Sequence, residues 1–200
     1  MILLEIESYL RGLKSVAILN WFCCSDQNFP RENSAFLPLI NRIFLVALKK
    51  LPVLFVSEDN LYSVYSPLAD RQPKERDNLV LARAYGIPGV KGDGNDVEFV
   101  CQQAREAVNH VRQGNGPFFL EFETYRWREH CGPNFDNDLG YRCEDEYKDW
   151  RERCPVENFQ KKLVSAGLLS VKQVEQMNQK IQKEIKEAFE FAKTSPFPNA

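Results

Sequence analysis

The sequence predicts an α/β fold, in which a parallel sheet is flanked by helices and followed by a pair of C-terminal helices. Residues 51–56 form a short, continuous apolar run rich in β-branched side chains, which is typical of a strand buried on both faces. Residues 95–112 repeat apolar side chains at helical spacing, and residues 117–124 form a second apolar run. A strand, a helix and a strand in this order indicate parallel strands joined by crossover connections.

Two helices are predicted within this part of the chain. Residues 76–85 place apolar side chains at helical spacing and are followed by Gly86, which favours a helix end. The helix at 95–112 is expected to begin with a capping box formed by Asn95 and Glu98, and to end at Gly114.

The C-terminal part predicts a helical pair, a short helix at 156–169 and a long one at 170–193. Ser170 and Gln173 have the spacing of a capping box at the start of the long helix. Its apolar side chains recur on one face, and we expect that face to pack in a core. The residues of this face are Val174, Met177, Ile181, Ile185 and Phe189.

Two other segments show no clear period. Residues 1–44 alternate apolar bursts with polar stretches, and we expect an irregular segment there. Residues 125–155 are dense in charged and aromatic side chains, which predicts a long functional loop with little packed structure of its own.

The composition is that of a soluble globular protein, with 44% hydrophobic and 27% charged residues among 200. A formal net charge of -2 gives no electrostatic footprint for nucleic acid or an anionic membrane. The apolar residues 16–24 are too few to span a bilayer, and Glu5 and Glu7 argue against a transit peptide. Six cysteines without C-x-x-C spacing, beside two histidines, make a zinc site unexpected and reduced thiols the expectation. We therefore expect a cytoplasmic protein.

Five motifs occur in one order along the chain: LKKLPVLFVSEDNLYSVY at 48–65, YGIPG at 85–89, DGND at 93–96, GNGP at 114–117 and TYRWREH at 124–130. Their order and spacing resemble the α subunits of the thiamine-diphosphate-dependent 2-oxo acid dehydrogenases, which act on pyruvate, branched-chain 2-oxo acids or acetoin. The resemblance covers about residues 45–198. It implies that residues 45–200 are the C-terminal part of an α-subunit domain, an incomplete thiamine-diphosphate-binding fold, and that residues 1–44 are unrelated to the family.

The resemblance also implies a cofactor site for thiamine diphosphate and Mg²⁺. Asn60 would bind Mg²⁺ through its amide oxygen and Tyr62 through its main-chain carbonyl, the hard oxygen ligands that this cation prefers. His130 would donate a hydrogen bond to the cofactor's diphosphate. Without the resemblance, residues 57–60 would read as a polar turn and His130 as a solvated side chain. The family usually has two asparagines where this chain has Asp59 and Asn60.

One part of the family's magnesium site is missing from the sequence. Counting back from Asn60 by the family's spacing reaches the neighbourhood of Arg31, where no Gly-Asp-Gly stands. The Gly-Asp-Gly at 92–94 follows Asn60, and we interpret it as a turn that leads into the next helix. The incomplete sheet would expose an edge and an apolar face, so we expect low stability or aggregation in isolation.

The function implied by the resemblance is oxidative decarboxylation of pyruvate or a related 2-oxo acid, with acyl transfer to lipoamide. The implied partners are the β subunit of the same dehydrogenase and its lipoyl-bearing E2 component, and the compartment is the mitochondrial matrix if the source is a eukaryote. No residue of this chain is expected to be the main acid or base. The alternatives are an acetoin dehydrogenase α subunit, a non-catalytic remnant that binds a β subunit, and a cofactor-free structural domain.

Overall fold

The computed structural model describes residues 17–22 and 43–197. They belong to two compact units, one reaching to Cys154 and the other beginning at Pro155. The strand and helix order of the first unit, with its parallel sheet and crossovers, confirms the predicted α/β class.

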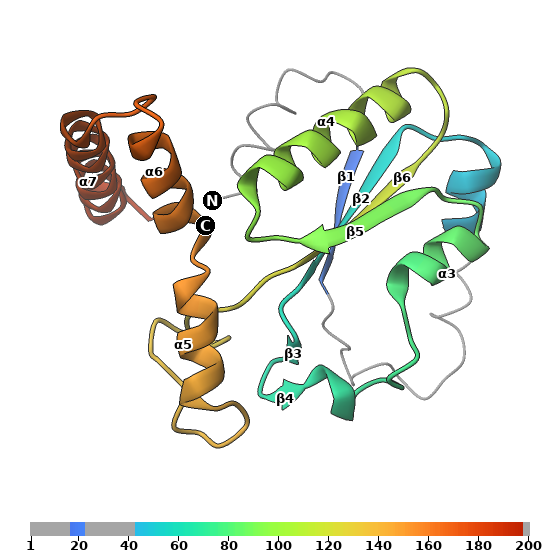
Figure 1. Ribbon diagram of the computed structural model, residues 1–200, viewed down its shortest axis with the longest axis horizontal. Helices are drawn as coiled ribbons and strands as arrows, with labels where there is room; N and C mark the ends of the chain where they lie inside the picture. The colour runs from blue at the N-terminus through green and yellow to red at the C-terminus, as the bar shows by residue number, and fades with distance from the viewer. Residues whose placement is uncertain (1–16, 23–42, 198–200) are drawn as a thin grey trace. The chain divides into compact units, whose positions relative to one another are not determined.

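The first unit is built on a four-stranded parallel sheet (Figure 1). The strands lie in the order β1 (Ala17–Phe22), β2 (Val53–Asp59), β6 (Phe118–Glu123) and β5 (Gly89–Asp93). Strands β2 and β6 were predicted from their apolar runs, whereas β5 was not, because its sequence GVKGD has little apolar character. All neighbouring pairs run parallel, so every strand ends at the same edge of the sheet.

Helices cover both faces of this sheet, and the alternation of side chains along β2 shows why. Leu54 and Val56 face helix α4 (Val97–Arg112), while Val53 and Phe55 face helix α3 (Asn78–Ala84) and the helical residues 43–48. Figure 1 shows α3 and α4 on opposite sides of the sheet. A strand buried on both faces favours apolar side chains on both of them, which is the pattern that residues 53–56 show and that predicted the strand.

Helix α4 confirms the predicted apolar face but corrects its start. Its buried face consists of Val100, Ala104, Ala107, Val108 and Val111. The N-cap is Asp96, whose carboxylate accepts hydrogen bonds from Glu98 N and Phe99 N, so the capping box expected at Asn95 and Glu98 is wrong by one residue. Asn95 instead takes part in the preceding turn, where its N–H donates to Asp93 Oδ1.

The Gly-Asp-Gly at 92–94 closes strand β5 and turns into α4, as expected. Gly94 N donates to Glu123 O at 2.7 Å, and a Cβ on Gly94 would lie 2.6 Å from that oxygen. Glycine stands here because the turn approaches the end of β6 so closely.

The segment between β2 and α3 contains the short strands β3 (Tyr62–Ser63) and β4 (Ser66–Pro67) and a 3-10 turn at Leu68–Asp70. After β6, the chain forms a loop and then helix α5 (Glu144–Glu152). The expectation that residues 125–155 would have little packed structure is therefore wrong. Their aromatic side chains pack against one another, and Trp150 on α5 is buried.

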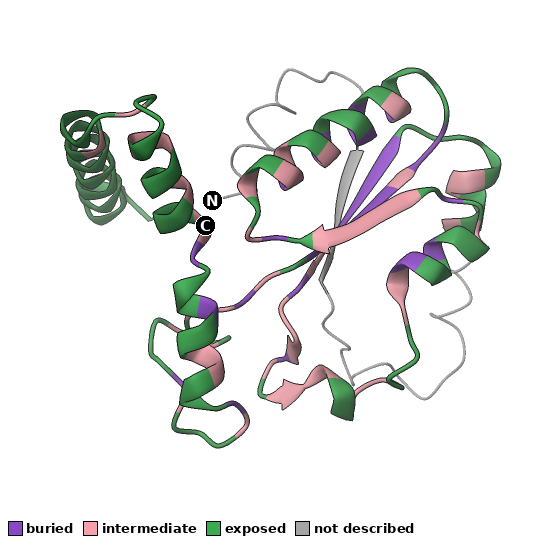
Figure 2. Cartoon of the chain, in the orientation of Figure 1, coloured by how far each residue is buried: buried purple, intermediate pink, exposed green. Residues whose placement is uncertain are grey.

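The second unit consists of the helices α6 (Pro155–Ser165) and α7 (Val171–Thr194), which confirms the predicted pair. The capping box of Ser170 and Gln173 is present. The expectation that the apolar face of α7 packs in a core is wrong, because neither helix has a buried residue and Ile181 is 50% exposed (Figure 2). Two helices enclose too little volume to bury a whole face. None of the helices that the structure describes is both long and apolar enough to cross a bilayer.

The expectation of an irregular segment at residues 1–44 is wrong in two places, at strand β1 and at residues 43–44, which begin the helical residues 43–48. Residues Ala17–Phe22 form β1, which pairs in parallel with β2 along its whole length. The stretch around Arg31, where the Gly-Asp-Gly was sought, lies outside the described residues.

Candidate functional site

The loop that follows β2 contains the first two predicted site residues, at the edge where all four strands end. Asn60 Oδ1 accepts a hydrogen bond from Tyr62 N at 3.1 Å, and Asp59 Oδ1 accepts one from Leu61 N at 3.0 Å. Leu61 takes a left-handed conformation with φ 68°. Two consecutive Asx turns thus hold Asn60 half-exposed beyond the strand. An amide oxygen has two lone pairs, so Asn60 keeps one acceptor position for a ligand.

The side chain of Tyr62 ties this loop to helix α5. Its hydroxyl donates to the Glu146 carboxylate, and its ring packs edge-to-face on Tyr141 with centroids 5.4 Å apart. Burial, followed by the hydrogen bond to Glu146, raises the pKa of Tyr62 above its ordinary value. The phenol therefore stays protonated and acts as a hydrogen-bond donor that positions the loop.

The third predicted residue, His130, is exposed in the loop between β6 and α5. Within the described part of the chain it makes no hydrogen bond, ion pair or ring contact. The structure joins Asn60 to Tyr62 by a hydrogen bond but shows no contact between His130 and either of them. Its role remains a prediction.

A buried ionic network, which sequence reasoning missed, holds the loop of His130. The Asp136 side chain is fully buried and bonded to Arg142 and to the Tyr141 hydroxyl. Arg126 donates to Tyr141 Oη at 2.8 Å and to Val64 O at 3.0 Å. A buried carboxylate is costly unless it is paired and hydrogen-bonded, and here both requirements are met.

This network connects the loop after β2 with the loop after β6, through the Arg126 bond to Val64 and the Arg142 Nη1 bond to Arg126 O at 2.6 Å. A signal was present in the sequence, because two Tyr-Arg pairs, at 125–126 and 141–142, enclose the loop. Which acid they surround could only be seen in three dimensions.

A second polar cluster lies at the carboxyl ends of β5 and β6, on the face of the sheet that α3 covers. Lys91 Nζ lies 3.2 Å from Glu121 Oε1 and 3.5 Å from Glu123 Oε1, and Glu121 is 1% exposed. Burial raises the pKa of Glu121, outweighing the neighbouring ammonium group. Burial lowers the pKa of Lys91, but the carboxylates of Glu121 and Glu123 raise it by more. The pKa of Lys91 therefore lies above its ordinary value. At the carboxyl ends of β5 and β6, one ammonium group thus lies between two carboxyl groups.

The described residues contain no group of three histidine, cysteine, aspartate or glutamate side chains placed to hold a metal ion. A metal in the loop after β2 would therefore depend on the Asn60 amide, on main-chain carbonyls and on groups from outside the described residues. Oxygen donors of this kind suit a hard cation such as Mg²⁺.

A parallel α/β sheet whose polar loops gather at the carboxyl ends of its strands defines a class of ligand-binding domain. The family model described as the Dehydrogenase E1 component matches residues 40–200, and the chain belongs to this family.

Curated relatives agree with this assignment. The chain is 33% identical to the pyruvate dehydrogenase E1 component subunit alpha of Rhizobium meliloti (strain 1021), over 78% of this chain and 44% of the relative. It is 34% identical to the chloroplastic subunit alpha-3 of Oryza sativa subsp. japonica, over 84% of this chain and 38% of the relative. It is also 34% identical to the mitochondrial testis-specific subunit alpha of Homo sapiens, over 78% and 39%. The chain thus spans about two fifths of the length of these relatives.

Proposed function

We propose that the chain is part of the α subunit of a thiamine-diphosphate-dependent dehydrogenase that decarboxylates pyruvate or a related 2-oxo acid. The observation that carries this proposal is the family match over residues 40–200, which includes the loop after β2. The names of the relatives support pyruvate as the substrate, which favours it over acetoin.

The proposed role of this chain is to anchor the cofactor. Asn60 would bind Mg²⁺ through the free acceptor position of its amide oxygen, and Tyr62 through its carbonyl oxygen. The exposed imidazole of His130 would donate to a diphosphate oxygen. When bound, the cofactor supplies the nucleophilic carbon and electron sink for decarboxylation. The Tyr62–Glu146 bond would hold the metal loop against α5 while this happens.

A β subunit of the same dehydrogenase and a lipoyl-bearing E2 component are the proposed partners. Since the relatives include chloroplastic and mitochondrial forms, the compartment would follow the source of the chain.

A second candidate is a remnant that binds a β subunit without cofactor. It is favoured by the lack of a carboxylate-rich metal group among the described residues and of the Gly-Asp-Gly at the family's spacing.

Isothermal titration with thiamine diphosphate and Mg²⁺ tests the two candidates. The full chain should be titrated alone and after co-production with a pyruvate dehydrogenase β subunit. We expect magnesium-dependent binding only in the presence of the β subunit. Asn60→Ala should lower the affinity for the cofactor about tenfold or more, because removing a residue that binds or orients a metal ion has an effect of that size.

The matched control is Asn115→Ala, which removes the same amide from an exposed turn. If Asn60→Ala leaves cofactor binding unchanged, Asn60 does not belong to the metal site. A stable complex with the β subunit that takes up no cofactor would favour the remnant instead.

A further inference from the structure

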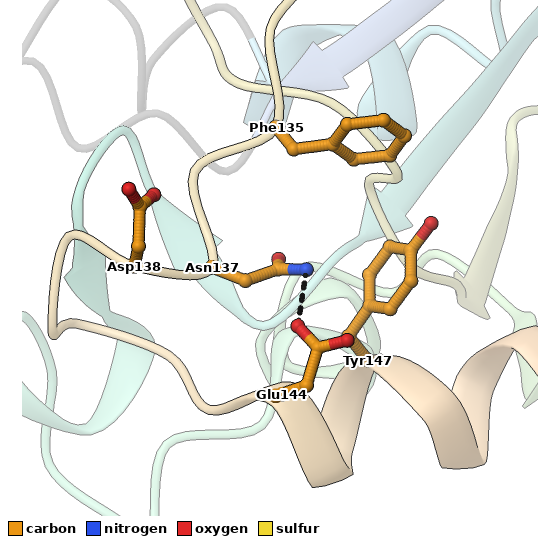
Figure 3. Close-up of a pocket in the computed structure, with 5 residues that line it drawn as sticks. All are labelled: Phe135, Asn137, Asp138, Glu144 and Tyr147. Carbon is orange, nitrogen blue, oxygen red and sulfur yellow. Dashed lines mark hydrogen bonds between the residues drawn. The ribbon is translucent and has the colours of Figure 1, made fainter.

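A hollow of about 600 Å³ lies where the loop after β6 meets helix α5, apart from the proposed cofactor residues. It is lined by Phe135, Asn137, Asp138, Glu144 and Tyr147. Figure 3 shows the Asn137 amide reaching toward Glu144, with the two aromatic rings beside them. A hollow of this size holds a side chain or a small organic molecule and is far larger than a metal ion needs.

The aromatic walls suit a cation. Phe135 is 53% exposed and stands edge-to-face with Tyr147, their centroids 6.0 Å apart. The guanidinium of Arg128 lies 3.7 Å from the Phe135 centroid, so one face of this ring already binds a cation of the chain itself. The faces of such rings attract positive charge through their quadrupole.

The polar lining is acidic and short of positive partners. Among the described residues, no basic side chain forms an ion pair with Asp138 or Glu144. Glu144 Oε2 accepts a hydrogen bond from Asn137 Nδ2 at 3.0 Å, while the Asn137 Oδ1 atom is buried with no partner. The Asp138 and Glu144 carboxylates therefore offer acceptor oxygens to the hollow, whereas the Asn137 Oδ1 atom is not accessible from it.

The hollow is held in shape before any ligand arrives. Asp136 lies between the lining residues Phe135 and Asn137 and is fixed by Arg126 and Arg142. Glu144 begins helix α5, whose positive N-terminal end stabilises the carboxylate. A preformed site binds its ligand without an ordering cost.

We propose that this hollow binds an organic cation, a protonated amine or guanidinium on an apolar stem, supplied by a free molecule or by a basic side chain of another protein. The Asp138 and Glu144 carboxylates would bind the charged group, and the aromatic rings would pack on the stem. None of the residues that line the hollow is a proposed cofactor residue, so the two proposals can be tested separately.

The test is a calorimetric titration of the full chain with butylguanidinium, N-acetylarginine amide and N-acetylcitrulline amide, the last being the neutral isostere. We expect the two cations to bind and citrulline not to. The combined variant Asp138→Asn and Glu144→Gln should weaken cation binding about tenfold, the sum of two partly exposed ion contacts. Tighter binding of the arginine amide than of butylguanidinium would point to a side chain of another protein, and the reverse to a free cation.

The control is Asp149→Asn, which removes one carboxylate charge from an exposed position of α5 outside the hollow and is therefore matched to Asp138→Asn alone. Binding should survive it, and thermal melting should show both proteins folded. If the combined variant does not fold, Asp138→Asn alone serves, since that exposed carboxylate makes no contact that the fold needs. Absence of saturable cation binding, equal binding of citrulline, or an equal loss in the control would overturn the proposal.

Discussion

Single residues in the loop after β6 owe their chemistry to burial. Tyr125 is 5% exposed and stacks on Trp150 with centroids 5.4 Å apart, and Tyr141 donates to the buried Asp136. Burial, the largest cause in both cases, raises the pKa of Tyr125 and of Tyr141 to about 12. The phenols are therefore held as neutral donors or apolar rings by the surrounding side chains.

These shifts predict a loss of stability in alkali. A free tyrosine loses its proton near pH 10, so between about pH 10 and pH 12 the unfolded chain is deprotonated while the folded phenols are still neutral. The unfolded state then binds fewer protons than the folded state, and the free energy of unfolding falls as the pH rises. We expect the urea midpoint to fall between about pH 10 and pH 12, and to fall less steeply in Tyr125→Phe. An unchanged slope in that variant would show that Tyr125 does not contribute.

Elements begin and end where side chains satisfy their main-chain groups, and helix α4 is an example. Two residues that can cap a helix, Asn95 and Asp96, stand side by side in the sequence. The structure selects Asp96, because Asn95 N is used in the turn after β5 and Gly94 N is bonded to β6. The start of α4 is thus set by how the preceding strand ends.

Helix α4 should lose stability with Asp96→Ala by about 1 kcal/mol, the usual effect of removing an N-cap. The matched control is Asn95→Ala, whose Nδ2 has no partner, and which should change stability by less than about 0.5 kcal/mol. Urea denaturation of both variants measures the difference. A larger loss for Asn95→Ala would instead support the cap predicted from the sequence.

The two units of the molecule differ in how far they are buried. The sheet unit has apolar clusters on both faces of its central strands, whereas the helices α6 and α7 have no buried residue. The exposed apolar face of α7 includes Met177, Ile181, Ile185 and Phe189. An apolar face of this kind can associate with another apolar surface, and the aggregation expected for the incomplete sheet stays a prediction.

Hydrogen exchange should separate the two units. The amides of α4, which pack on the sheet, should exchange only on global unfolding, while those of α7 should exchange through local opening at least about tenfold faster. Mass-spectrometric exchange of the full chain measures both helices in one experiment, so each serves as the control for the other. Equal protection of the two helices would show that α7 is buried in solution.

Much of the fold could be predicted from local patterns. The apolar run of β2, the apolar face of α4 and the capping box of α7 each depend on residues close together in the chain. Strand β5 could not be predicted, because GVKGD becomes a strand only by pairing with β6. Within the candidate site, the turn at Asn60 could be predicted from residue type. The network around Asp136 could not, because it joins residues up to 78 positions apart, from Val64 through Arg126 to Arg142.

The sequence by itself determined the α/β class, the family resemblance and the polar loop at the end of β2, since these follow from residue type and short-range spacing. The tertiary structure alone decided that β1 joins the sheet, that the apolar face of α7 stays exposed within its own unit, and that Asp136 is buried between two arginines. The physical reason is that burial and charge pairing depend on which surfaces meet. Local patterns say which face of an element is apolar, but not what covers it.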